Sequence, residues 1–210
     1  MFRLLAFDFD GTIADTLGEM RCIYNELAAD YGARQVEEEE MERLRQLSLP
    51  ELIVDLGVPA HRVPSLVTRG TGRLRGRIER IELIEGIREV LQTLKGRVDH
   101  LGILTSNSSD NVERFLEVHQ LGGLFEFISS KSSLTGKSRH LKAILTTFSL
   151  KPHEMLYIGD ELRDVKASQK AGIPVAAVSW GFNAHEALAQ AKPDFLFDAP
   201  QQLLELMGKD

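Results

Sequence analysis

The sequence lacks several features that would set its class at once. It holds a single cysteine, Cys22, so no disulfide can form within the chain and a reducing compartment is expected. No apolar run approaches the roughly 20 residues that span a bilayer. The first apolar run reaches Asp8 too soon for a secretory signal peptide. Together these absences predict a cytoplasmic protein with no membrane partner.

Positive charge is also in short supply. The chain has 25 Lys and Arg against 31 Asp and Glu, a formal net charge of −6. Proteins that bind nucleic acid by neutralising its phosphates carry a basic surplus, so no nucleic-acid partner is expected. A small phosphorylated metabolite remains compatible as a partner, because one local group of cations is enough to hold it.

Short apolar runs, each followed by a polar or acidic residue and a turn, recur along the chain. Because they are apolar on both alternating faces, they indicate buried parallel strands. Stretches with helical periodicity lie between them, as in Ile87 to Lys95. This alternation predicts an α/β fold with a doubly wound, Rossmann-like parallel sheet. The predicted strands are residues 4–9, 101–104, 125–128, 155–158, 175–178 and, more weakly, 195–197.

Residues from about 16 to 83 break this alternation. Leu17 to Tyr31 predicts a helix, the acidic run Glu37 to Glu40 begins a second, and Arg73 to Ile84 predicts a last one. Strong strand patterns do not occur among them. The simplest interpretation is an all-helical cap domain inserted into an α/β core domain. The predicted boundaries are 16–83 for the cap, and 1–15 with 84–210 for the core.

The first predicted strand ends in two carboxylates, within Asp8-Phe9-Asp10-Gly11-Thr12. In an open parallel sheet, ligands bind beyond the carboxyl ends of the strands, near the point where the strand order reverses. Two acids in an apolar strand are costly unless a cation neutralises them, and Mg²⁺ prefers such oxygen ligands. One carboxylate can face a phosphorus atom while the other faces a leaving oxygen. The segment therefore predicts phosphoryl transfer.

Three further segments carry complementary groups. Thr105-Ser106-Asn107 follows the second strand and offers hydroxyls and loop amides to phosphoryl oxygens. Lys137, in Thr135-Gly136-Lys137-Ser138, begins a helix where a cation could balance an aspartate and a phosphoryl group. Asp160 and Asp164 follow another strand and, four apart, face one side of a helical turn. Phosphoryl transfer needs this kind of positioning and charge neutralisation, and carboxylates are known to form aspartyl-phosphate.

With these four segments in this order, the sequence resembles the haloacid dehalogenase (HAD) superfamily, in its branch of phosphoglycolate-phosphatase-like hydrolases. The resemblance covers essentially the whole core and implies a helical cap between the first two motifs. It implies a Mg²⁺-dependent phosphatase that hydrolyses a small phosphate monoester, phosphoglycolate-like or a sugar phosphate, through a phospho-aspartate. Relatives that cleave carbon–halogen or carbon–phosphorus bonds lack the second aspartate of the first motif, so Asp10 favours phosphate esters.

The resemblance also assigns roles to individual residues. Asp8 would be the nucleophile, Asp10 the general acid and later the base, and Thr105 and Lys137 would complete the catalytic set. The residues expected to bind the substrate phosphate are Thr12, Thr105, Ser106, Asn107 and Lys137. The expected Mg²⁺ ligands are the carboxylate of Asp8, the backbone carbonyl of Asp10, and Asp160, with Asp164 acting directly or through water.

Several alternatives stay open. A phosphomutase of the same superfamily would return the phosphoryl group to a sugar. A non-catalytic phospho-receiver or binding protein also combines aspartates, Mg²⁺, a Thr or Ser and a Lys, although receivers carry the phosphorylated aspartate on a later strand. The sequence does not say whether the chain is a monomer or a homodimer, or whether the cap arginines or Trp180 contact the substrate. The basic residues Arg69, Arg73, Arg75, Arg77 and Arg80 are interpreted as a solvated helix face that pairs with the acidic run.

Overall fold

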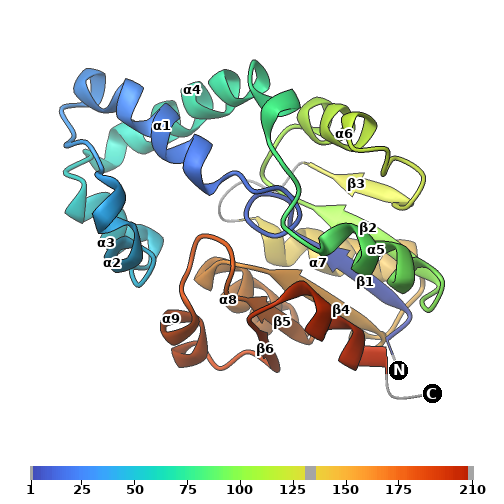
Figure 1. The fold of residues 1–210 in the computed structure, drawn as a ribbon. Helices are drawn as coiled ribbons and strands as arrows, with labels where there is room; N and C mark the ends of the chain where they lie inside the picture. The colour runs from blue at the N-terminus through green and yellow to red at the C-terminus, as the bar shows by residue number, and fades with distance from the viewer. Residues whose placement is uncertain (1, 131–135, 208–210) are drawn as a thin grey trace.

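A computed structural model, which describes residues 2–130 and 136–207, shows a six-stranded sheet flanked by helices, with a further group of helices beside it (Figure 1). All strand pairs are parallel, and the strand order is β3-β2-β1-β4-β5-β6. This confirms the predicted doubly wound α/β sheet. The strands are β1 (Leu4–Phe7), β2 (His100–Leu104), β3 (Phe127–Ser129), β4 (Met155–Gly159), β5 (Val175–Val178) and β6 (Phe195–Phe197).

Helices cover both faces of the sheet. One face carries α5 (Ile87–Lys95), α6 (Ser109–Val118) and the C-terminal 3-10 helix η6 (Pro200–Met207). The other face carries α7 (Lys137–Thr147), α8 (Leu162–Ala171) and α9 (His185–Gln190). In β1, Leu5 and Phe7 pack into the first of these layers, whereas Leu4 and Ala6 pack into the second. Burial on both faces explains why every position of β1 is apolar.

The chain between β1 and α5 forms the helical cap. It contains α1 (Leu17–Ala28), α2 (Met41–Leu44), α3 (Leu49–Asp55) and α4 (Val63–Arg75), with short 3-10 turns at Ala29–Tyr31, Glu38–Glu40, Ala60–Arg62 and Ile78–Arg80. The chain leaves the core and returns through one antiparallel connection, in which Ala14 pairs with Leu83. This connection lies at the predicted domain boundary, but the division into two domains stays a prediction.

One predicted helix is wrong. Residues 73–84 were expected to form the last cap helix, but α4 ends at Arg75 and one 3-10 turn follows before the chain becomes extended. The reason is tertiary: the Ile84 N–H donates to the Ile13 carbonyl at 2.9 Å, and the Asp15 N–H donates to the Glu82 carbonyl at 2.9 Å. These backbone bonds to the outgoing chain replace the bonds of a helix.

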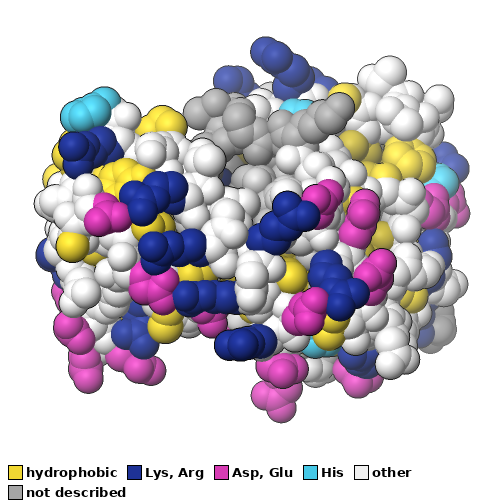
Figure 2. All heavy atoms as spheres, turned by 90° about the horizontal axis from the view of Figure 1, so that it is seen from above, with side chains coloured by type: hydrophobic (Ala, Val, Ile, Leu, Met, Phe, Trp, Pro, Cys, Tyr) yellow, Lys and Arg dark blue, Asp and Glu magenta, His cyan; other side chains and the backbone are white. Residues whose placement is uncertain are grey.

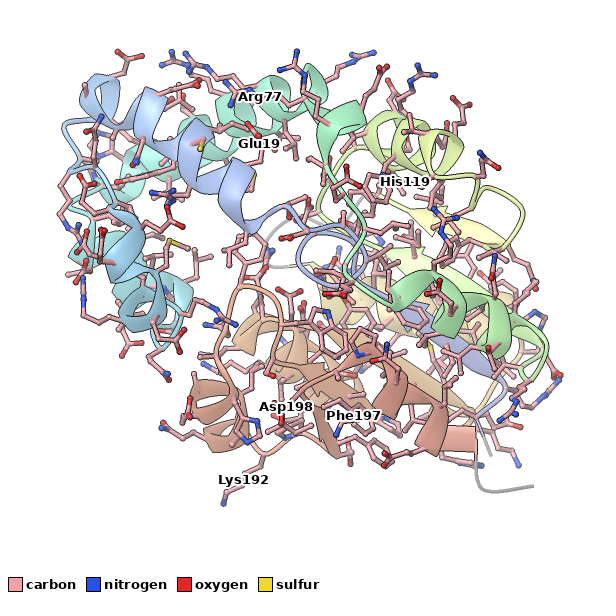
Figure 3. The ribbon with its side chains drawn as sticks, in the orientation of Figure 1. Glu19, Arg77, His119, Lys192, Phe197 and Asp198 are labelled. Carbon is pink, nitrogen blue, oxygen red and sulfur yellow. The ribbon has the colours of Figure 1, made fainter. Side chains whose placement is uncertain are left out.

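The cap surface carries arginines and acidic side chains close together (Figure 2). The predicted ion-paired helix face is present, but its main partners belong to α1 and the turn after it, and not to the acidic run. Arg69 pairs with Asp30 at 2.8 Å and Arg73 with Glu26 at 2.6 Å. Arg77 pairs with both Glu19 and Glu26, and Figure 3 shows Glu19 and Arg77 together on the outer side of the cap. Over the described residues, no helix has the length and apolarity needed to cross a membrane.

Candidate active site

The residues predicted from the four segments meet where β1 and β4 lie side by side. The strand order reverses between these two strands, since the chain adds β2 and β3 on one side and β5 and β6 on the other. Asp8 follows β1, Asp160 follows β4, and Asp164 lies in the first turn of α8. Lys137 is the first residue of α7.

Lys137 joins two of these acids in a buried ion-paired group. Its Nζ lies 2.7 Å from Oδ2 of Asp8 and 2.6 Å from Oδ1 of Asp164, and all three side chains are at most 6% exposed. Burial alone would lower the pKa of Lys137, but Asp164 and Asp8 outweigh it and raise that pKa to about 12. Burial raises the pKa of Asp8 to about 7, although the charge of Lys137 opposes the rise.

Asp160 is held by its neighbours on both oxygens. The Thr12 hydroxyl donates to Oδ1 at 2.7 Å, and the Phe182 N–H donates to Oδ2 at 2.7 Å. Burial, followed by the nearby acids Glu161, Asp164 and Asp8, raises the pKa of Asp160 well above its ordinary value. A Cβ atom at Gly11, whose φ is +73°, or at Gly181 would collide with the Asp160 carboxylate. Glycine at these two positions therefore makes room for this acid.

The charges of this group fit a divalent cation. Asp8, Asp160 and Asp164 are all buried, and each offers a carboxylate oxygen within 4.8 Å of the others. These three carboxylates share one ammonium group, that of Lys137, so their negative charge is only partly balanced. Oxygen ligands of this kind suit Mg²⁺. The Asp10 carboxylate is not part of this group. The sequence predicts that Asp10 binds the metal through its backbone carbonyl, and that contact stays a prediction.

Asp10 is oriented by a separate set of amides. The Asn107 side chain donates to both Asp10 oxygens at 3.1 Å, and Asn111 in turn donates to the Asn107 side-chain oxygen at 2.8 Å. Burial raises the pKa of Asp10 to about 6, while the hydrogen bond from Asn107 opposes the rise. A carboxyl group with this pKa can give and take a proton near neutral pH.

The predicted phosphate-binding residues lie around the carboxylates of Asp10 and Asp160. Thr105 is buried, and its hydroxyl accepts a hydrogen bond from the Asn107 N–H at 3.0 Å. Ser106 is half-buried beside it. Thr12 contacts Asp160 and Asn107 contacts Asp10, so the predicted contact of either side chain with a phosphate stays a prediction. Thr135, quoted in the third motif, lies outside the described residues.

Two residues that the sequence did not single out connect the cap to this site. Arg45, which directly follows α2, donates to the carbonyl of Gly181 at 3.0 Å and to that of Ser179 at 2.5 Å. Asn183 donates to the carbonyls of Arg45 and Leu47, both at 3.0 Å. We call these contacts the cap latch. Trp180, in the same loop, is the residue that the sequence left open as a substrate contact, and its Nε1 donates to the Thr12 carbonyl at 3.2 Å.

Comparison with known proteins shows the family of the chain. Residues 5–178 match the family model of the haloacid dehalogenase-like hydrolases. A phosphoglycolate phosphatase from Synechococcus elongatus is 34% identical over 203 residues, which are 97% of this chain and 96% of that protein. A pyrophosphatase, PpaX, from Bacillus pumilus is 30% identical over 60% of each chain. The fold is that of a haloacid dehalogenase-like family hydrolase from Streptococcus pneumoniae, with a TM-score of 0.81 at 19% identity over 98% of both chains. The chain therefore belongs to the haloacid dehalogenase-like hydrolases, in their phosphoglycolate-phosphatase-like branch.

Proposed function

We propose that the protein is a Mg²⁺-dependent phosphatase that hydrolyses a small phosphate monoester through a phospho-aspartate at Asp8. The observation that carries the proposal is the buried contact of Lys137 with Asp8 and Asp164, beside Asp160 at the reversal point of the sheet. The phosphoglycolate phosphatase from Synechococcus elongatus, which matches almost the whole chain, makes phosphoglycolate the first ester to try.

Mg²⁺, held by Asp8, Asp160 and the backbone carbonyl of Asp10, with Asp164 direct or through water, would neutralise the charge of the phosphoryl oxygens. The chain itself supplies the remaining groups. Lys137 fixes the Asp8 carboxylate and adds a positive charge beside it. Thr12 and the Phe182 N–H keep the Asp160 carboxylate in one orientation.

In the first step, an oxygen of Asp8 forms a bond to phosphorus while the bond from phosphorus to the ester oxygen breaks. Asp10, protonated, gives its proton to that leaving oxygen, so an alcohol departs. The pKa of Asp10, about 6, leaves a minor fraction of the free protein in this protonated form at pH 7. The two hydrogen bonds from Asn107 orient the Asp10 carboxyl group.

In the second step, a water molecule attacks the phosphorus of the acyl phosphate. Asp10, now a carboxylate, accepts the proton of this water as the bond between phosphorus and Asp8 breaks. Inorganic phosphate leaves and both aspartates return to their starting states. Cap closure would exclude bulk water from the site, and the cap latch ties the cap to the 179–184 loop beside Asp160.

The test is phosphate release from a panel of phosphorylated metabolites, with Mg²⁺ and with a chelator. Asp8→Asn should lower kcat at least about a thousandfold, because the reacting carboxylate is removed. Asp15→Asn is the matched control, since Asp15 is an exposed aspartate seven positions further on and should keep its activity. Undiminished activity of a folded Asp8→Asn protein would refute the proposal.

A further inference from the structure

The cap and the core enclose a cavity of about 290 Å³ that opens onto the candidate active site. Asp10, Ser106 and Asn107 line its core end. Its cap end is lined by apolar side chains of α1, α3 and α4, among them Met20, Ile23, Leu52, Ile53, Leu66 and Leu74. A group attached to a phosphate at the active site would extend into this apolar space.

The cavity offers a second anion little to pair with. Arg163 is the one cationic side chain among the described lining residues. It pairs with Glu161, which also lines the cavity, and its buried Nε has no hydrogen-bond partner. Arg69, Arg73 and Arg77 of the cap pair with Asp30, Glu26 and Glu19 and do not line the cavity. Figure 3 shows Arg77 beside Glu19. An unpaired carboxylate buried there would be strongly disfavoured.

The polar groups at the cap end are already engaged. The Tyr24 hydroxyl donates to the Arg34 carbonyl at 2.8 Å, and the Thr71 hydroxyl donates to the Val67 carbonyl at 2.9 Å. These bonds lie within the cap and satisfy the donors of both hydroxyls. The cap end of the cavity therefore presents an apolar surface to a ligand.

The catalytic groups also indicate which part of the substrate faces the cavity. Asp10, which in the proposed function protonates the leaving oxygen, lines the cavity, whereas Asp8 and Lys137 are not among its lining residues. The leaving alcohol must therefore lie on the cavity side of the phosphorus, and the nucleophile on the other side. This orientation agrees with in-line attack, in which the two oxygens are on opposite sides.

We infer that the substrate is a phosphate monoester of an uncharged, apolar aliphatic alcohol, an inference that rests on the proposed phosphatase function. The phosphate binds at Asp8 and Lys137, and the alkyl group fills the cavity under the cap. Esters with a second anion, such as 2-phosphoglycolate, are poorer substrates. The volume and apolar lining of the cavity determine this preference. The position of Asp10 determines that the alkyl group points into the cavity.

The first test compares kcat/KM for methyl, propyl and hexyl phosphate with that for 2-phosphoglycolate, in Mg²⁺ with the wild-type protein. Burial of each methylene should raise kcat/KM by up to about fourfold, until the cavity is full. Propyl phosphate should exceed 2-phosphoglycolate, which is of similar size but carries a carboxylate. A flat alkyl series, or a preference for 2-phosphoglycolate, would overturn the inference and leave the phosphatase function standing.

A second test places the alkyl group without relying on turnover. Calorimetry with methylphosphonate and hexylphosphonate measures binding to two variants, Thr71→Asp and Thr68→Asp. Both threonines lie on α4 and donate to the carbonyl four residues earlier at 2.9 Å, but only Thr71 lines the cavity. Thr71→Asp should weaken hexylphosphonate binding about tenfold and methylphosphonate binding little, because it places a carboxylate against the alkyl chain. Thr68→Asp should change neither.

The two proposals fail in different ways. Equal hexylphosphonate affinities in the two threonine variants would show that the alkyl chain lies elsewhere, which overturns the inference alone. Absence of any Mg²⁺-dependent phosphate release across all four esters and the metabolite panel would overturn the phosphatase function, and the inference with it. Release that is retained in Asp8→Asn would contradict the mechanism, whatever the preference among esters.

Discussion

Replacing Lys137 by methionine tests the buried charge group most directly. Methionine keeps an unbranched chain of similar length but removes the ammonium group between Asp8 and Asp164. Those side chains are 4% and 0% exposed, so both carboxylates would remain buried and unpaired. Breaking a buried pair costs about 3–5 kcal/mol, which for a chain of this size corresponds to a fall in Tm of roughly 6–20 °C.

The loss of stability should depend on pH. Burial raises the pKa of Asp8 to about 7 even with Lys137 present, and without that cation the pKa rises further. The folded variant then binds more protons than the unfolded chain, whose carboxyls titrate near pH 4. Its stability therefore falls as the pH rises from 5 to 8, by at most about 1.4 kcal/mol per pH unit for the Asp8 carboxyl group.

The assay is urea unfolding of the wild type and the variant in a chelator, at pH 5.5 and at pH 8. Lys95→Met is the control, because Lys95 makes a surface pair with Glu126 at 3.0 Å and its side chain is 32% exposed. A surface pair of this kind contributes about 0–1 kcal/mol. If Lys137→Met destabilised the protein no more than Lys95→Met, or equally at both pH values, the buried charge group would not exist as described.

Three further predictions follow from the same contacts. Mg²⁺ should raise the Tm of the wild type, since ligands of the folded state stabilise it, and Asp160→Asn should reduce that rise; equal shifts would remove Asp160 from the metal site. Arg45→Ala should raise KM and speed proteolysis within the cap, because its charged hydrogen bonds to the 179–184 loop are worth about 1.5–3 kcal/mol; unchanged values would contradict the cap latch. Gly70→Ala and Gly72→Ala should each raise the free energy of unfolding by about 0.5–1 kcal/mol, because α4 gains helix propensity and no atom lies closer than 3.9 Å to either added Cβ. If Gly70→Ala alone lowered the free energy of unfolding, there would be no space for a methyl group where Gly70 lines the cavity.

The strands and the core helices were predictable because their pattern is local. A helix at Ile87–Lys95 was predicted at its observed bounds, since apolar residues recur on one face and Gly96 ends it. The predicted helix at 73–84 is wrong although its three isoleucines, at 78, 81 and 84, have a helical spacing. These side chains instead pack into the core from a 3-10 turn and from the extended chain that follows it. Helix α4 was missed because Val63, Pro64 and the glycines at 70 and 72 weaken its helical propensity.

The sequence by itself determined which chemistry the site can perform. Polar residues that end parallel strands lie at one edge of the sheet, so Asp8, Thr105 and Asp160 had to lie near one another once the strands were recognised. Only the tertiary structure decided their partners: Thr12 with Asp160, Asn107 with Asp10, and Arg45 with the 179–184 loop. It also decided that the cap and the core enclose a cavity whose cap end is apolar. These contacts join residues about 100 to 150 positions apart, and such pairings depend on how whole layers pack, which no local pattern in the sequence encodes.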